Sequence, residues 1–140
     1  MKADNCIFFQ LAKASQTGTK FLYSKVSGLN ITPVQAMVIG FLSEQDQVMA
    51  GELGKKVELD SATLTGILDR LEAAHLIERK GNPDDRRSIK IHLTKQGQET
   101  GREAKKLIEE ANKEFLAAFT EEEKHELRSL ITKLREHFVV

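Results

Sequence analysis

The chain has 140 residues, of which 40% are hydrophobic and 30% charged, and its 21 basic and 21 acidic residues leave no net charge. This size suits one domain with a real core and is short for an enzyme with a separate cofactor domain. The apolar run near the start, Ile7 to Phe9, is too short for an export signal or a membrane span. Cys6 is the single cysteine, so no internal disulfide can form. We therefore expect a cytoplasmic protein without a membrane segment.

The first part of the chain predicts two helices. Apolar residues recur at helical spacing from about residue 4 to residue 27, and Gly28 then ends the pattern. Thr32 and Pro33 open a second helix, the threonine as the N-cap of a capping box and the proline in the first turn. This helix is apolar on most sides through Leu42, which predicts that it lies in the core.

The middle of the chain predicts two further helices separated by a turn. Val48 and Met49 can form a short strand, residues 51–57 a first helix, and residues 58–60 the turn into the second. Asp60 or Ser61 supplies the N-cap oxygen of this second helix. One apolar stripe follows it at three- and four-residue steps, and its members are Leu64, Ile67, Leu68 and Leu71.

The opposite side of this second helix is small and polar. Ser61, Thr63 and Thr65 are candidates for contacts in a DNA major groove, because short hydroxyl side chains allow close approach and can bond base edges or phosphates. Arg70, late in the helix, can bind a phosphate or pair with an acidic neighbour, Asp69 or Glu72. The alternative for each is an ordinary solvent-facing position.

A basic β-hairpin follows. Residues 77–80 and the alternating run from Ile89 to Leu93 predict two paired strands, with turn formers at residues 81–84. From residue 79 to residue 95, six basic residues minus two acidic ones give a local balance of +4. The basic residues are Arg79, Lys80, Arg86, Arg87, Lys90 and Lys95. The alternative is a solvated hairpin tip that contacts no partner.

A narrow helix beside a basic hairpin predicts a winged helix-turn-helix. The helix would lie in the major groove of double-stranded DNA, while the hairpin holds the flanking backbone or the minor groove. Arg86 and Arg87 sit at or just past the predicted tip. One of them can enter a narrow minor groove, while the other can pair with Asp84 or Asp85. Lys90 adds a positive charge on the following strand.

Two stretches resemble the MarR (multiple antibiotic resistance regulator) family. The run from Asp85 to Thr94 fits the family's D-x-R-x5-L-T wing signature, with Arg87 at the position of its arginine. Leu68 to Glu72 fits the end of its recognition helix, and the order of elements fits over nearly the full length. The resemblance implies a mainly α fold with a small β-wing. It also implies a dimeric repressor of pseudo-palindromic operators.

The terminal helices leave apolar surface uncovered. Thr94 can cap a long helix that runs to about Phe119, and a second capping box starts a last helix. We expect these helices and the first one to cover each other across the two-fold axis of a homodimer, with packing inside one chain as the alternative. Residues 1–32 and 95–140 would form the helical dimerisation region, and residues 33–94 the DNA-binding lobe, in one intertwined domain.

Most members of the family respond to small phenolic or anionic ligands, so the resemblance implies an effector of this class and no cofactor. Such ligands bind between the dimer helices and the DNA-binding lobe. Phe8, Phe9, Met37 and Phe41 can line such a cleft, although ordinary core packing explains this spacing as well. A ligand releases DNA only if it binds better to a lobe spacing that mismatches the half-sites.

Cys6, at the start of the first predicted helix, resembles the thiol of the MarR regulators that sense organic hydroperoxides. In that branch, oxidation of the thiol releases DNA, and tyrosines four and fourteen residues further along hydrogen-bond to it. Here these positions hold Gln10 and Lys20, and the only tyrosine is Tyr23. The alternative is a small buried hydrophobic residue at the base of the dimer.

His75 departs from the family pattern, in which a glycine usually follows the recognition helix at the left-handed C-cap position. Histidine tolerates a positive φ better than most residues with a side chain, so we expect a tolerated cap. A pH-sensing role is the alternative.

The sequence patterns argue against an enzyme. The four histidines lie in no metal-ligand spacing, and the sequence contains no G-x-S-x-G, P-loop or dinucleotide motif. Because acidic residues, Asp84 and Asp85, accompany the basic ones at the wing tip, a winged-helix module for protein contact without DNA is the remaining alternative.

Overall fold

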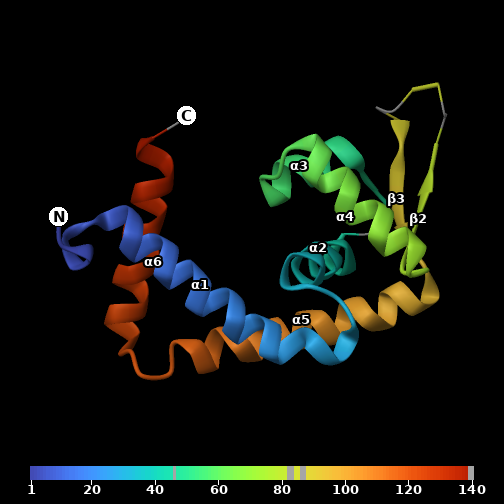
Figure 1. Cartoon of the computed structure of the whole chain (residues 1–140). Helices are drawn as coiled ribbons and strands as arrows, with labels where there is room; N and C mark the ends of the chain where they lie inside the picture. The colour runs from blue at the N-terminus through green and yellow to red at the C-terminus, as the bar shows by residue number, and fades with distance from the viewer. Residues whose placement is uncertain (46, 82–83, 86–87, 139–140) are drawn as a thin grey trace.

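The computed structural model describes residues 1–45, 47–81, 84–85 and 88–138. The described part is mainly helical, with one three-stranded antiparallel sheet (Figure 1). In chain order its elements are η1 (Ala3–Asn5), α1 (Ile7–Val26), η2 (Ser27–Leu29), α2 (Pro33–Glu44), β1 (Val48–Met49), α3 (Ala50–Val57), α4 (Ser61–Ala73), β2 (Ile77–Lys80), β3 (Lys90–Leu93), α5 (Lys95–Phe115) and α6 (Glu121–His137).

The sheet confirms both the predicted short strand and the predicted hairpin. β3 is the central strand and is antiparallel to β1 and β2, with Val48 opposite Ile91 and Ile77 opposite Leu93. The inward residues of β3 are buried, whereas Lys90 is exposed. The period-two pattern therefore places the apolar side chains on the core and the basic one in solvent.

The predicted N-caps start four of the helices. Capping boxes are present at Thr32 and Thr120, and the hydroxyl of Thr94 accepts a backbone amide in the first turn of α5. Asp60, rather than Ser61, caps α4. These caps satisfy backbone amides that have no partner inside their helices. Cap residues in the sequence therefore predict where these helices begin.

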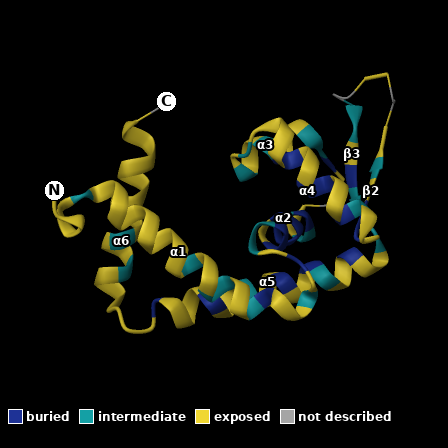
Figure 2. Ribbon diagram, in the orientation of Figure 1, coloured by how far each residue is buried: buried dark blue, intermediate teal, exposed yellow. Residues whose placement is uncertain are grey.

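The core lies where α2, α3, α4 and the sheet meet (Figure 2). Its largest fully buried side chains include Ile39 of α2, Leu53 of α3, Leu71 of α4 and Ile91 of β3. Val26 of α1 and Ala104 of α5 belong to the same cluster, and the last turn of α1 and the first half of α5 therefore complete the lobe. The predicted boundaries between lobe and dimerisation region stay a prediction.

The end of α4 is joined to the start of α5 by close contacts of the backbone. His75 has a φ of 61°, as expected of a left-handed cap, and its carbonyl accepts the Thr94 hydroxyl at 2.6 Å. The Leu76 carbonyl accepts the Thr94 amide at 3.1 Å. A Cβ added to Gly97 would lie 1.8 Å from that carbonyl oxygen. Only glycine fits here.

The first and last helices expose large apolar side chains, and α6 has no buried residue (Figure 2). The alternative of a closed three-helix packing within one chain is therefore wrong. The exposed apolar residues include Ile7, Phe8, Leu11, Phe115, Phe119, Leu130, Ile131 and Leu134. α5 ends at Phe115, four residues before the predicted end at about Phe119, and turns follow over residues 116–119.

Within the described residues, no single helix is long and apolar enough to cross a membrane. Residues 7–29 and α2 reach that length and composition only as a pair bent by 67°. Half of α2 is buried in the core.

The contact at Gly97 gives a stability prediction. Gly97→Ala should lower the free energy of unfolding by about 3 kcal/mol or more, because the added methyl group overlaps backbone that cannot move independently. Gly28→Ala is the matched control, since a Cβ there would meet nothing within 4 Å. Urea unfolding of both variants measures the difference, and equal stability of the two would contradict the contact.

Candidate nucleic-acid interface

α4 begins at a charged N-cap. The Asp60 carboxylate accepts the backbone amide of Thr63 at Oδ1 and the Thr63 hydroxyl at Oδ2, both at 2.8 Å. The amide hydrogen bond and, after it, the hydroxyl hydrogen bond hold the pKa of Asp60 below its ordinary value. The carboxyl group is therefore ionised at neutral pH. Thr63, a predicted base contact, has its hydroxyl hydrogen engaged inside the helix.

The other two predicted hydroxyl residues lie on the exposed surface of α4. Thr65 donates its hydroxyl to the Ser61 carbonyl at 2.7 Å, so this hydrogen too is engaged within the helix. The Ser61 hydroxyl has no hydrogen-bond partner among the described residues. Of the three candidates, Ser61 is the one whose donor is available to a ligand.

The centre of the outward face holds two residues that the sequence reasoning missed. At about 100° per residue, Ala62 and Gly66 lie opposite the buried stripe of α4, and both are exposed. Thr63 and Thr65 lie on the two flanks. The helical periodicity alone could have found Ala62 and Gly66. They were not predicted as contacts because they carry no hydrogen-bonding side chain.

Arg79 of β2 joins the hairpin to α4. Its Nη2 lies 2.7 Å from Asp69 Oδ1 and 2.9 Å from Glu72 Oε1, and its backbone amide donates to Glu72 Oε2 at 3.1 Å. The guanidinium, first through its side-chain hydrogen bond, lowers the pKa of Glu72, and Glu72 in turn raises the pKa of Arg79. Of the two alternatives for Arg70, the pairing with Asp69 or Glu72 is therefore wrong, because Arg79 pairs with both acids.

The remaining predicted cations are exposed or lie outside the described residues. Arg70 has no ion-pair partner within the described part of the chain, and its guanidinium is open to a ligand. Lys90 is exposed at the start of β3, opposite Lys80. Arg86 and Arg87 lie outside the described residues, so their predicted positions at the wing tip remain predictions.

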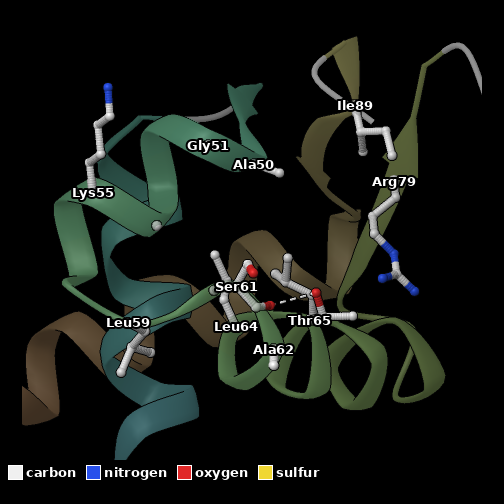
Figure 3. A pocket seen from close by; sticks show the side chains of 12 residues that line it. Ala50, Gly51, Lys55, Leu59, Ser61, Ala62, Leu64, Thr65, Arg79 and Ile89 are labelled. Carbon is white, nitrogen blue, oxygen red and sulfur yellow. Dashed lines mark hydrogen bonds between the residues drawn. The ribbon is translucent and has the colours of Figure 1, made fainter. Parts of the chain in front are cut away.

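A cleft of about 1080 Å³ opens between α3, α4 and the hairpin (Figure 3). Ser61 and Thr65 lie at its floor, with Lys55 of α3 on one side and Arg79 with Ile89 on the other. Its lining is mainly apolar elsewhere. The recognition helix, the first helix of the motif and the wing therefore surround one concave surface.

The other predicted site residues lie apart from this cleft. Cys6 is half-buried at the N-cap of α1. The start of α1 lies away from α4 (Figure 1). Phe8, Phe9 and Met37 are exposed, whereas the Phe41 ring lies under the Lys56 ammonium at 5.3 Å. The cleft is lined by none of these five. Among the described residues, no group of three His, Cys, Asp or Glu side chains could hold a metal ion.

The Arg79 ion pairs predict a pH-dependent stability. Because the folded-state pKa of Glu72 is lowered, its pairing stabilises the fold above the ordinary glutamate pKa and is lost as the pH falls through the lowered value. Both acids are partly exposed, so Arg79→Ala should cost only about 1 kcal/mol at neutral pH. Urea unfolding at pH 7 and near pH 3 should show this gap shrinking in acid. Lys90→Ala, on the adjacent strand, is the control and should show no such gap, because Lys90 has no ion-pair partner among the described residues.

Known transcriptional regulators are similar to this chain in sequence over much of its length. The MarR family model matches residues 31–89. The organic hydroperoxide resistance transcriptional regulator of Bacillus subtilis (strain 168) is 37% identical over 97 residues, which cover 69% of this chain and 66% of that regulator. The homoprotocatechuate degradative operon repressor of Escherichia coli is 31% identical over 121 residues, which cover 86% of this chain and 82% of the repressor.

The fold agrees with these sequence matches. A crystal structure of a mutant MarR from E. coli, complexed with operator DNA, is 27% identical with a TM-score of 0.79, covering 89% of this chain and 90% of that one. The relatives are transcriptional regulators and not enzymes. The sequence resemblance is therefore confirmed, and the chain belongs to the MarR family of winged-helix transcriptional regulators.

Proposed function

We propose that the chain is a dimeric repressor that binds pseudo-palindromic operators and is released by a small ligand. The observation that carries this proposal is the small, exposed face of α4 beside a hairpin that Arg79 ties to the same helix. A helix and a wing held as one unit can engage the major groove and the adjacent backbone together. Two relatives support this assignment by their names, one as an operon repressor and one by its complex with operator DNA.

The proposed contacts divide by chemistry. Ser61, Thr63 and Thr65 would face base edges in the major groove, with Ser61 as the free donor. Arg70 would bind phosphate on the flank of α4, because its guanidinium has no acidic partner among the described residues. On the wing, Arg86, Arg87 and Lys90 would hold the minor groove and the backbone.

The proposed dimer explains the exposed apolar surface of the terminal helices. Soluble proteins rarely leave so many large apolar side chains in water unless a partner covers them. The residues concerned are at both ends of the chain, away from the face that would meet DNA (Figures 1 and 2). A second copy of this chain, related by a two-fold axis, would bury them and set two α4 helices at a fixed spacing.

Operator selection from random DNA duplexes tests the function. The purified protein should enrich a pseudo-palindrome whose half-sites lie about 34 Å apart, and its binding should weaken steeply as salt rises. Selection without any enriched sequence would instead favour the winged-helix module for protein contact. Candidate phenolic acids are then added to the enriched complex, and a releasing ligand should lower operator affinity.

Oxidation of Cys6 is a second candidate for the release signal. It is favoured by the similarity to the organic hydroperoxide resistance regulator and by the position of Cys6 at the start of α1. Peroxide treatment of the wild type and of Cys6→Ser, in parallel with the selection, separates the two signals. Loss of the enriched sequence in the wild type alone would support the thiol switch, and equal retention by both proteins would exclude it.

The dimer gives a further prediction. Leu130→Asp combined with Leu134→Asp places two charges in the apolar face of α6 and should yield a monomer in analytical ultracentrifugation. Operator affinity should fall by 100-fold or more (about 3 kcal/mol), because one half-site then binds alone. Ser129→Asp, on the opposite face of α6, is the control and should stay dimeric. A doubly substituted protein that remains dimeric would place the interface elsewhere.

A further inference from the structure

We propose that Gly66 determines how closely the recognition helix approaches its operator. The missing side chain would let the backbone of α4 lie directly against the base edges on the floor of the major groove. This inference rests on the proposed function, since it concerns the face of α4 that would enter DNA.

Glycine is an unfavourable residue at this place in the fold. Gly66 lies in the interior of α4, which runs from Ser61 to Ala73, and is not part of either cap. In a helix interior glycine loses more backbone entropy than any other residue and ranks just above proline as a helix former. The helix therefore forms in spite of Gly66, and a glycine here calls for a reason outside the helix itself.

The surrounding structure does not supply that reason. Gly66 has no positive φ, and a Cβ added to it would meet nothing within 4 Å. Gly97 and Gly101 are different, because a Cβ would lie 1.8 Å from the Leu76 carbonyl oxygen in the first case and 3.0 Å from the Ser43 Cβ in the second. Packing explains those two glycines. The space over Gly66 is open to solvent.

The position of Gly66 on α4 points to the reason. It lies opposite the buried stripe, next to Ala62 and between the flanking residues Thr65 and Arg70. A helix with its side chains is about 10–12 Å across, and the major groove of B-DNA is about 12 Å wide and 8.5 Å deep. The fit is tight, so the residue at the deepest point decides how far the helix can enter. Close approach of a backbone to a ligand is a recognised use of glycine.

Gly66→Ala should raise the stability of the helix and lower the affinity for the operator. The variant should unfold at a temperature roughly 2–5 °C higher than the wild type, because alanine is the better helix former. Its Kd for the selected operator should rise by about tenfold or more, since the methyl group keeps the helix off the base edges. Its Kd for random-sequence DNA should be unchanged, because nonspecific binding depends on phosphate charge. Thermal unfolding and fluorescence anisotropy with the two DNAs measure all three quantities.

Gly40→Ala is the matched control. Gly40 is also interior to a helix, α2, but its added Cβ would touch only the Cδ1 of Ile108, at an ordinary 3.9 Å within the same chain. This variant should gain thermal stability and keep both Kd values. Ala62→Leu provides a second probe of the deep face, since leucine is a good helix former at an exposed position. It should lose operator affinity even if Gly66→Ala folds poorly.

The outcomes distinguish this inference from the proposed function. If the wild type enriches an operator and folded Gly66→Ala binds it with wild-type Kd, the inference about Gly66 is overturned and the function stands; if Gly66→Ala does not fold, a wild-type Kd of Ala62→Leu overturns it. If the wild type enriches no sequence, the proposed function fails, and with it the inference. A selective loss of operator affinity, at unchanged affinity for random DNA, supports the close approach at Gly66.

Discussion

The close contact between the end of α4 and the start of α5 is the constraint on which the arrangement of this protein depends. The Leu76 carbonyl oxygen lies where any side chain on Gly97 would have to be, and Thr94 bonds both to it and to the His75 carbonyl. These contacts fix the axis of α5 relative to the recognition helix. Because α5 runs from this contact toward α1 and α6, a change in the orientation of those helices would move α4 with it (Figure 1). The wing is tied to the same helix through Arg79, and so the elements proposed to touch DNA form one body.

A rigid lobe limits how such a regulator can respond to a signal. If the helix, the wing and the start of α5 keep their mutual geometry, only the distance and angle between the two lobes of the proposed dimer can vary. A ligand or an oxidised thiol would then act by favouring a different lobe spacing, and its effect is bounded by its differential affinity for the two spacings. The half-buried position of Cys6, at the far end of α1 from the lobe, is compatible with such an indirect action.

The sequence predicted the features of this structure that depend on local chemistry. Caps at Thr32, Thr94 and Thr120 are set by bonds three residues apart, and the strands by alternation, so both can be seen in a linear pattern. The partner of Asp69 and Glu72 could not be predicted in this way, because Arg79 reaches them only after the hairpin folds back on α4. Gly66 was missed for another reason. Its position follows from the helical period, but a search for hydrogen-bonding side chains gives no weight to a residue without one.

The ionised Asp60 at the start of α4 would restrict where this end of the helix can lie on DNA. A bare helix N-terminus attracts phosphate through its free amides, but here a carboxylate already satisfies the Thr63 amide and brings a negative charge of its own. This end of the helix would therefore be repelled by the sugar-phosphate backbone and tolerated only over the groove. Cations on the flank and the wing would draw the protein onto the duplex, while Asp60 would make placements shifted onto the phosphate ridge unfavourable. Attraction by the cations and repulsion by Asp60 on the same lobe would thus align α4 with the groove before any side chain contacts a base.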